Sequence, residues 1–302
     1  MVRYCPDADI VTWVGCVRES FVGLIANRGD HETGMPTSTP PAVAAATPTA
    51  RAVAATMLAT RPPIDEDDPS LKVLAIVHQR DAGPGVFAEA IAGAGGVLDE
   101  WTLAERPEPP ADPLGYDAVF VLGGAMHVDE GERHGWIAEE EALLRELLTH
   151  EVPLLGLCLG GQLLAAAAGA KPRRASRPEI GWHQVEVTPE GADDPLLGPL
   201  APSFEAFQWH SYEFPLPAGA VPLARSEVCL QAARLGERAW ALQFHPEVSR
   251  VDALHWVDDY EADPDAVRIG IDPAVLGPET EAKIGAFNDL GRELCRRWLA
   301  TI

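Results

Sequence analysis

The sequence has little positive charge. Its 302 residues include 23 lysines and arginines against 46 aspartates and glutamates, which gives a formal net charge of −23. Lysine is especially scarce and occurs at Lys72, Lys171 and Lys283. A surface of this charge repels the phosphate backbone of DNA or RNA, so we exclude nucleic acid as a partner.

Cysteine is also sparse, and its spacing is wide. The sequence contains five cysteines and no CxxC pair; they stand at Cys5, Cys16, Cys158, Cys229 and Cys295. An odd, scattered set of this kind argues against a disulfide framework and against a zinc site, and it fits a reducing cytoplasm. We therefore expect a cytoplasmic protein with no metal and no organic cofactor.

Long hydrophobic runs are absent as well. No stretch of about 18 apolar residues occurs, so we expect no membrane span. The first twenty residues carry charges where a signal peptide needs an unbroken apolar core, and we expect no export signal.

The chain changes character near residue 70. Residues 35–70 are rich in Pro, Ala and Thr and end in an acidic run, a composition that cannot bury enough apolar surface to offset its ordering entropy. Residues 1–34 either form a short helix or are upstream sequence included by a wrong start codon, with Met35 and Met57 as later starts. We predict a disordered leader over residues 1–69 and one domain over 70–302.

Within 70–302, apolar runs first alternate with helical patterns. The predicted strands are 72–77, 116–124 and 152–157, and the helices that follow them are 86–96, 135–151 and 160–170. This order predicts parallel strands joined by right-handed crossovers, in an open α/β sheet. Later strands are expected at 183–188, 220–225, 228–234 and 238–245, before an amphipathic helix at 281–302.

Cys158 lies where the third strand turns into its helix, in the stretch GLCLGGQLLA. The flanking glycines permit a tight turn, and the positive end of a helix favours a thiolate over a thiol. A nucleophile elbow has this geometry. Cysteine is also a common buried residue, so the stretch alone leaves a structural role open.

A second motif supplies the partners that a cysteine nucleophile needs. His245 is expected to end a strand, and Glu247 follows after Pro246, which fixes the backbone between them. A base and an orienting acid at neighbouring strand ends would complete a Cys-His-Glu triad. Taken alone, the HPE motif also suits an exposed histidine beside a solvated glutamate.

Together these motifs resemble the class-I (triad) glutamine amidotransferases. The family has a G-x-C-x-G-x-Q elbow, a downstream H-P-E and, before both, an oxyanion loop at a strand that ends in Gly-Gly. The matching residues are Gly123, Gly124, Gly156, Cys158, Gly160, Gln162, His245, Pro246 and Glu247. The resemblance covers roughly residues 72–250. It implies a flavodoxin-like, doubly wound and mostly parallel sheet with helices on both faces, followed by additional antiparallel strands.

The resemblance also implies a role for each residue. Cys158 would attack the amide carbon of glutamine, His245 would carry the proton to ammonia, and Glu247 would hold the imidazole. The backbone N–H groups of Gly124 and Leu159 would stabilise the oxyanion. Among side chains, Gln162 would help to bind the substrate.

A further stretch, FQWHSYEF, matches the family's W-H-G-D segment in part. Trp209 and His210 match, whereas Ser211 and Tyr212 replace Gly and Asp. We expect all four residues to bind substrate. The acidic group that would pair with the substrate ammonium is missing unless Glu213 replaces it, so the identity of the substrate stays open.

No P-loop occurs, and residues 250–302 are too few for a synthetase domain. We therefore expect a glutaminase that releases ammonia for a separate synthetase subunit, or a hydrolase of γ-glutamyl amides and peptides that needs no acceptor. A non-catalytic binding relative and a cysteine peptidase or deglycase-like enzyme are the remaining alternatives.

Overall fold

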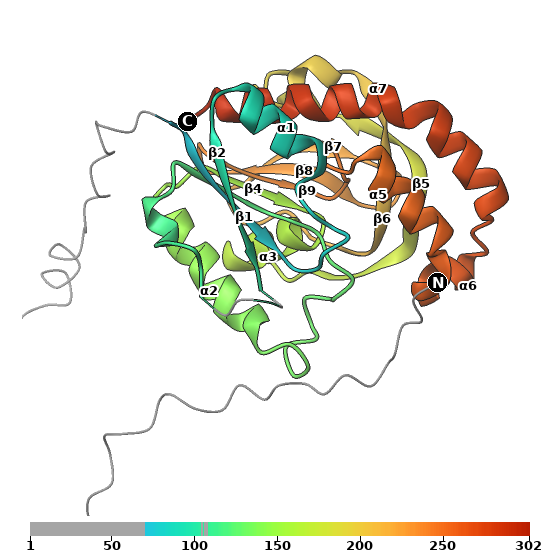
Figure 1. Ribbon diagram of the computed structural model, residues 1–302, viewed down its shortest axis with the longest axis horizontal. Helices are drawn as coiled ribbons and strands as arrows, with labels where there is room; N and C mark the ends of the chain where they lie inside the picture. The colour runs from blue at the N-terminus through green and yellow to red at the C-terminus, as the bar shows by residue number, and fades with distance from the viewer. Residues whose placement is uncertain (1–69, 104, 106–107) are drawn as a thin grey trace, which may run out of the picture. The chain divides into compact units, whose positions relative to one another are not determined.

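A mixed β-sheet forms the centre of the structure (Figure 1). The structure is a computed structural model that describes residues 70–302 except 104, 106 and 107, so the predicted leader lies outside the described residues. The strands in chain order are β1 (Lys72–Val77), β2 (Val97–Thr102), β3 (Ala118–Val121), β4 (Leu154–Leu157), β5 (Arg173–Val187), β6 (Ser203–Glu213), β7 (Val221–Arg225), β8 (Leu230–Leu235) and β9 (Ala239–Leu242).

Helices follow most of the strands in the first half of the chain. The α-helices are α1 (Gly85–Gly93), α2 (Trp136–Thr149), α3 (Leu159–Ala167), α4 (Pro189–Ala192), α5 (Arg250–Asp258), α6 (Pro264–Ile269) and α7 (Pro273–Leu299). Short 3₁₀ turns are η1 (Pro113–Gly115), η2 (Gly198–Leu200) and η3 (Tyr260–Ala262). In the described part of the chain, no helix has the length and apolar character needed to cross a membrane.

The sheet has a parallel half and an antiparallel half. Its order is β2-β1-β3-β4-β9-β8-β7-β5-β6, in which the first five strands are mutually parallel and the later pairs are antiparallel. The parallel half has the flavodoxin-like order. From β1 the chain moves out to the edge strand β2 and then crosses back to β3, on the other side of β1. This arrangement confirms the predicted fold class.

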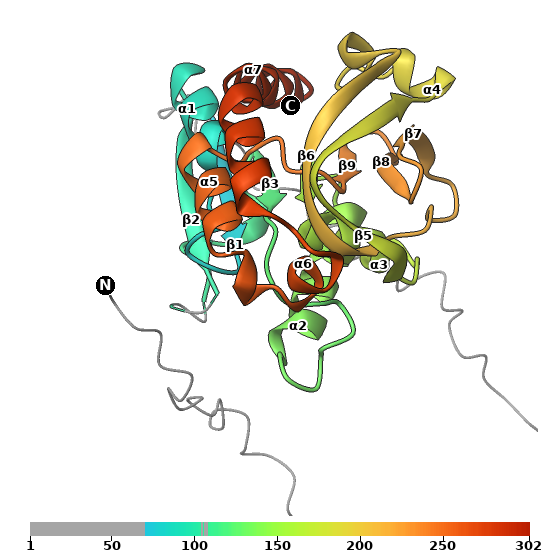
Figure 2. The same ribbon diagram turned by 90° about the vertical axis from the view of Figure 1, so that its right-hand side faces the viewer.

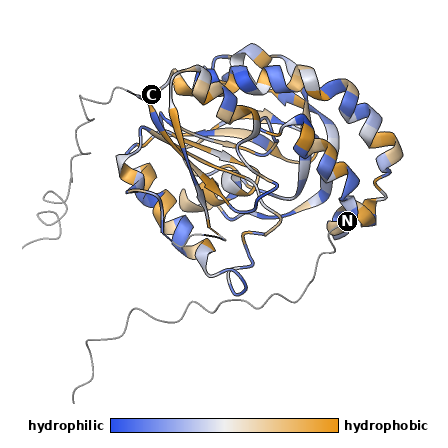
Figure 3. Cartoon of the chain, viewed as in Figure 1, coloured by the Kyte–Doolittle hydropathy of each residue, from blue (hydrophilic) through white to orange (hydrophobic). Residues whose placement is uncertain are grey.

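Two hydrophobic layers cover the sheet. Val73 packs in the cluster that contains Phe87 of α1 and Trp298 of α7, while the next residue, Leu74, packs in the cluster that contains Leu144 of α2. Successive strand residues point to opposite faces, so a continuous apolar strand such as β1 must be covered on both sides. Figures 1 and 2 show α1, α5 and α7 together on one face, with α2 and α3 on the other. In Figure 3 the central strands are mainly hydrophobic, whereas hydrophobic and hydrophilic residues alternate along the helices.

The terminal helix begins earlier than the pattern predicted. We expected a helix over 281–302, whereas α7 starts at Pro273 and continues past Pro278. Asp272 caps it by accepting a hydrogen bond from the backbone N–H of Ala274 at 2.9 Å. Pro273 stands at the first helical position, where its missing N–H loses no hydrogen bond, whereas Pro278 lies inside the helix and lacks the N–H that would bond to the preceding turn.

Three strands of the sheet, β2, β5 and β6, were missed or predicted only in part. The edge strand β2 was not predicted, because its burial pattern shows no regular alternation. The strand expected at 183–188 is only the last part of β5, and the FQWHSYEF stretch lies on its antiparallel partner β6. Figure 2 shows β5 and β6 as a long curved pair.

Candidate active site

The carboxyl ends of neighbouring parallel strands meet at one edge of the sheet. Gly123 and Gly124 follow β3, Cys158 follows β4, and His245 follows β9 after a short bend. His245 was expected to end its strand; instead β9 stops at Leu242, and the backbone N–H of His245 bonds to a carbonyl of β6. Parallel topology thus gathers residues from three separate motifs.

Cys158 has a backbone conformation that few residues other than glycine adopt. Its φ is 52° and its ψ is −110°, at the position that caps the N-terminus of α3. Such a conformation costs about 1–3 kcal/mol and persists only where the surrounding structure holds it. Here the backbone N–H of Cys158 donates to the carbonyl of Leu242 at 2.8 Å, and the residue is only 5% exposed.

The glycines of the elbow allow the chain segments to touch. A Cβ atom on Gly160 would lie 2.2 Å from the carbonyl oxygen of Val121, and one on Gly156 would lie 2.5 Å from the carbonyl oxygen of Gly160. Real Cβ atoms do not approach backbone so closely. These two glycines therefore let α3 start directly against β3 and β4, which fixes where Cys158 points.

His245 and Glu247 form a buried pair next to Cys158. Nδ1 of His245 lies 2.8 Å from Oε1 of Glu247, and each residue is 2% exposed. A Cβ atom on Gly123 would lie 2.9 Å from Cε1 of His245 and 3.5 Å from Cβ of Cys158, so the two side chains meet beside this glycine. Although burial opposes it, the charges of Glu247 and Cys158 and hydrogen bonds to both raise the pKa of His245 to about 10.

Cys158 and His245 open into a cavity of about 410 Å³. The residues predicted to bind substrate or stabilise the oxyanion also line it, namely Gly124, Leu159, Gln162, Trp209, His210, Ser211 and Tyr212. Glu247 does not reach the cavity and lies behind His245. The structure therefore brings together every site residue that the sequence predicted, and the arrangement suits nucleophilic attack by a thiol on a small substrate.

Comparisons with known proteins agree with this geometry. The sequence model of the family "Glutamine amidotransferase class-I" matches residues 99–254. The chain belongs to this family. A glutamine-hydrolysing GMP synthase subunit from Halobacterium salinarum is 33% identical over 153 residues, which cover 50% of this chain and 76% of that protein.

Two further relatives extend the comparison within the class-I family. A γ-glutamyl-L-1-hydroxyisopropylamide hydrolase of a Pseudomonas species is 30% identical over 150 residues, covering 46% of this chain and 50% of that protein. The crystal structure of a glutamine amidotransferase from Thermotoga maritima superposes with a TM-score of 0.69 at 29% identity, covering 77% of this chain and 99% of that one. The predictions of the family and of a glutaminase-type hydrolase are confirmed.

The W-H-S-Y stretch lies on β6 and forms one wall of the cavity. Trp209 packs against the hydrophobic core and lines the cavity, so it is both a core aromatic and a pocket wall. The amide of Gln162 donates to the backbone carbonyl of Tyr212 at 3.1 Å, which ties α3 to this wall. Glu213 pairs with Arg173 at 2.8 Å and does not line the cavity, so Glu213 does not supply an acidic group to the cavity.

Residues from outside the motifs complete the cavity. Arg174 of β5 lies within 2.6 Å of both carboxylate oxygens of Asp265 on α6, and Nε1 of Trp209 donates to Asp263 at 3.0 Å. These bonds hold the segment from η3 to α6 over the cavity. The sequence did not reveal this segment, because no local motif marks a contact such as Arg174–Asp265, whose residues are 91 positions apart.

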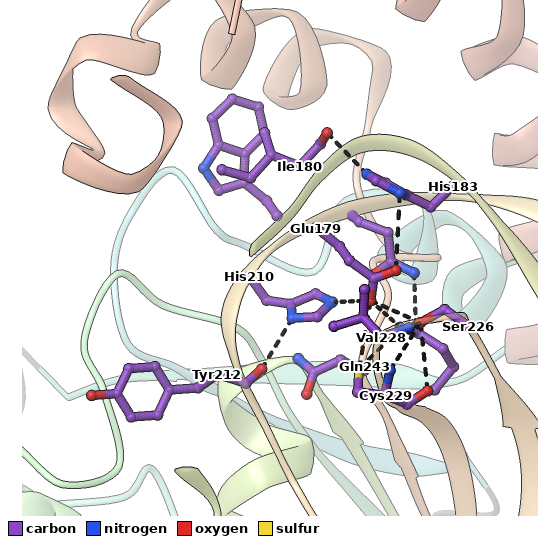
Figure 4. Close-up of polar contacts among 12 residues, drawn as sticks. Glu179, Ile180, His183, His210, Tyr212, Ser226, Val228, Cys229 and Gln243 are labelled. Atoms are coloured by element: carbon purple, nitrogen blue, oxygen red, sulfur yellow. Dashed lines mark hydrogen bonds and ion pairs between the residues drawn. The ribbon is translucent and has the colours of Figure 1, made fainter. Parts of the chain in front are cut away.

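A buried polar cluster lies behind the same wall (Figure 4). The ligand atoms of Glu179, His210 and Cys229 lie within 4.8 Å of one another, a spacing that could hold a metal ion. However, Gln231 and Ser226 donate to Oε2 of Glu179 at 2.8 and 3.0 Å, and burial raises the pKa of the Cys229 thiol. We interpret the cluster as a buried carboxylate surrounded by hydrogen-bond donors, which anchors His210 on β6.

Proposed function

We propose that this chain hydrolyses the γ-amide of glutamine, with Cys158 as nucleophile, His245 as acid and base, and Glu247 as the group that orients the imidazole. One observation carries this proposal. Cys158, in its strained backbone conformation, lies beside His245, and Nδ1 of His245 is held by Oε1 of Glu247 at 2.8 Å. Family membership supports the same reaction.

In the proposed reaction, His245 holds the proton of the Cys158 thiol while the sulfur attacks the γ-carbonyl carbon. The carbonyl oxygen becomes an oxyanion near the N–H groups of Gly124 and Leu159, each worth a few kcal/mol of transition-state stabilisation. His245 then protonates the leaving nitrogen, ammonia departs, and a γ-glutamyl thioester remains. Water hydrolyses the thioester to glutamate and regenerates the thiol.

Ammonia release from glutamine tests this assignment. Cys158→Ala should abolish release, because no other group can form the thioester, while circular dichroism and the melting temperature stay close to those of the unmodified protein. Cys295→Ala is the matched control, since Cys295 is buried outside the cavity and should leave most of the activity. Full activity in Cys158→Ala would overturn the proposal.

A γ-glutamyl amide larger than glutamine is the second candidate substrate. It is favoured by Tyr212, which stands where the family's segment has an acid, and by the η3–α6 segment, which extends the cavity beyond β6. In this alternative, Arg174 would bind the substrate α-carboxylate at the cavity rim. Comparing kcat/KM for glutamine and for γ-glutamyl alkylamides decides between them, because a pocket shaped for a larger leaving amine should prefer the alkylamide by at least about tenfold.

The fate of the ammonia is the remaining part of the proposal. Relatives such as the Halobacterium protein are named as subunits, which supports transfer to a separate synthetase subunit. Turnover of glutamine by the isolated chain at about 1 s⁻¹ or faster would instead favour an independent hydrolase, since typical enzymes reach that rate without a partner.

A further inference from the structure

A second buried histidine–carboxylate pair lies behind the oxyanion loop. His78 follows β1 and Glu140 lies on α2; the residues are 3% and 4% exposed, and neither lines the cavity. Nε2 of His78 lies 2.9 Å from Oε2 of Glu140, and its Nδ1 lies 3.0 Å from the carbonyl oxygen of Gly123. The ring of Trp136 stacks on the imidazole at 5.0 Å.

The contacts of His78 set its protonation. A carbonyl oxygen can only accept, so Nδ1 carries a hydrogen, and a neutral imidazole would then present a lone pair to the Glu140 carboxylate. Although burial opposes it, the charge of Glu140 and hydrogen bonds to Glu140, Gly123 and Leu122 raise the pKa of His78. The contacts at both ring nitrogens therefore favour an imidazolium that donates to Gly123 and to Glu140.

The bond to Gly123 fixes a peptide that faces the nucleophile. The carbonyl of Gly123 and the N–H of Gly124 belong to one planar trans peptide and point in opposite directions. Because His78 holds the carbonyl on one side, the N–H is directed to the other side, where Gly124 lines the cavity beside Cys158. A two-glycine loop without this bond could rotate the peptide at little cost.

We propose that His78 and Glu140 are positioning residues that orient and polarise the Gly123–Gly124 peptide, so that the Gly124 N–H stabilises the oxyanion. This inference rests on the proposed amide hydrolysis. A cation that bonds the carbonyl oxygen draws electrons from the amide and strengthens its N–H as a donor. The pair acts through Gly124 and touches neither substrate nor the reacting atoms.

Three variants separate the parts of this arrangement. In His78→Asn the side-chain amide takes the place of Nδ1, so the bond to Gly123 is kept without the charge; in His78→Gln the amide takes the place of Nε2, so that bond is lost. Glu140→Gln removes the countercharge. Glu146→Gln is the matched control, because Glu146 is an exposed residue of the same helix.

The expected result is a loss of kcat without a loss of substrate binding. Removing an oxyanion-hole donor lowers kcat by about 10²–10³-fold, so a misdirected donor in His78→Gln should cost about 10–100-fold in kcat with KM within about threefold. His78→Asn and Glu140→Gln should lose less, and Glu146→Gln should match the unmodified enzyme. Affinity for the γ-aldehyde analogue of glutamine, whose thiol adduct carries an oxyanion, should fall by the same factor as kcat.

Alkylation of Cys158 by iodoacetamide distinguishes this role from a structural one. The displacement forms no oxyanion, so its rate should stay within about twofold in all variants if the elbow and His245 are intact. Equal losses of alkylation and of kcat, or an unchanged kcat in His78→Gln, would overturn the inference.

A readout without turnover keeps the test independent of the proposed function. Two N–H signals from the His78 ring near pH 7 in ¹⁵N NMR, together with a rotated Gly123–Gly124 peptide in the crystal structure of His78→Gln, would support the inference even if glutamine is not the substrate. A single N–H, or an unrotated peptide, would overturn it. Absence of ammonia release from every γ-glutamyl amide, by contrast, would count against the proposed function.

Discussion

Nδ1 of His245 lies 2.8 Å from Oε1 of Glu247, two residues further along the same chain segment. Pro246 stands between them, so a short rigid turn presents both side chains to the interior. The turn is held in place by the backbone carbonyl of Glu247, which accepts from the N–H of Val86 at 2.8 Å. The His245–Glu247 pair is thus anchored to α1 as well as to the sheet.

Replacing Glu247 by Gln should damage catalysis more than folding. The amide can donate to Nδ1 and favour the wrong tautomer, so we expect kcat for ammonia release to fall by about 10²–10⁴-fold with KM nearly unchanged. Glu237→Gln, a change of the same kind at a side chain that is 89% exposed, is the control. A Glu247→Gln enzyme with normal kcat would show that the carboxylate does not orient His245.

Alkylation should be selective among the cysteines. Burial raises the pKa of Cys229 and raises that of Cys295 to about 12, and neither lines the cavity, whereas Cys158 does. In the folded protein near pH 7.5 we expect a glutamine-analogue electrophile to label Cys158 at least about 100-fold faster than the other two, as measured by mass spectrometry of peptides. Equal and slow labelling of all three would favour a non-catalytic binding protein.

A methyl group on Gly160 should destabilise the fold. In Gly160→Ala the new Cβ would meet the carbonyl oxygen of Val121 at 2.2 Å, so we expect the free energy of unfolding in urea to fall by about 2–4 kcal/mol. Gly93→Ala is the control, since a Cβ there meets nothing within 4 Å and helical alanine is favoured over glycine by about 0.5–1 kcal/mol. Stability within about 0.5 kcal/mol of the unmodified protein for Gly160→Ala would contradict the close packing.

Asp265 should make the free energy of unfolding depend on pH in the acidic range. Burial would raise its pKa, but hydrogen bonds from Ser211, Arg268 and Arg174 lower it to about 2 from 3.8. The carboxylate therefore contributes about 2 kcal/mol above pH 4, and this contribution is lost as the pH falls from about 4 to 2.

Asp265→Asn tests this linkage. We expect the variant to be less stable by about 1–2 kcal/mol at pH 7, with a difference that shrinks as the pH approaches 3. Asp289→Asn, at a side chain that is 83% exposed, should change stability by less than about 0.5 kcal/mol. A pH-independent difference for Asp265→Asn would mean that its ion pairs do not set its pKa.

The Cys158 and His245–Glu247 motifs, and the parallel strands other than the edge strand β2, could be predicted from the sequence. Local signals carried both, because a strand–Cys–Gly–helix turn and an H-P-E turn each need particular residues in a particular order. The continuous apolar runs at β1, β3 and β4 likewise indicate strands that are buried on both faces. The order of these motifs along the chain then matched that of the family.

The surroundings of Cys158, by contrast, depend on tertiary contacts between distant segments. His78 reaches Glu140 across 62 positions and Arg174 reaches Asp265 across 91, and neither pair has a local pattern. Strand β6 and the early start of α7 escaped prediction because long-range packing determines them more than periodicity does. The local turn therefore places Cys158 directly after β4, while contacts between distant segments hold this turn and shape the cavity beside it.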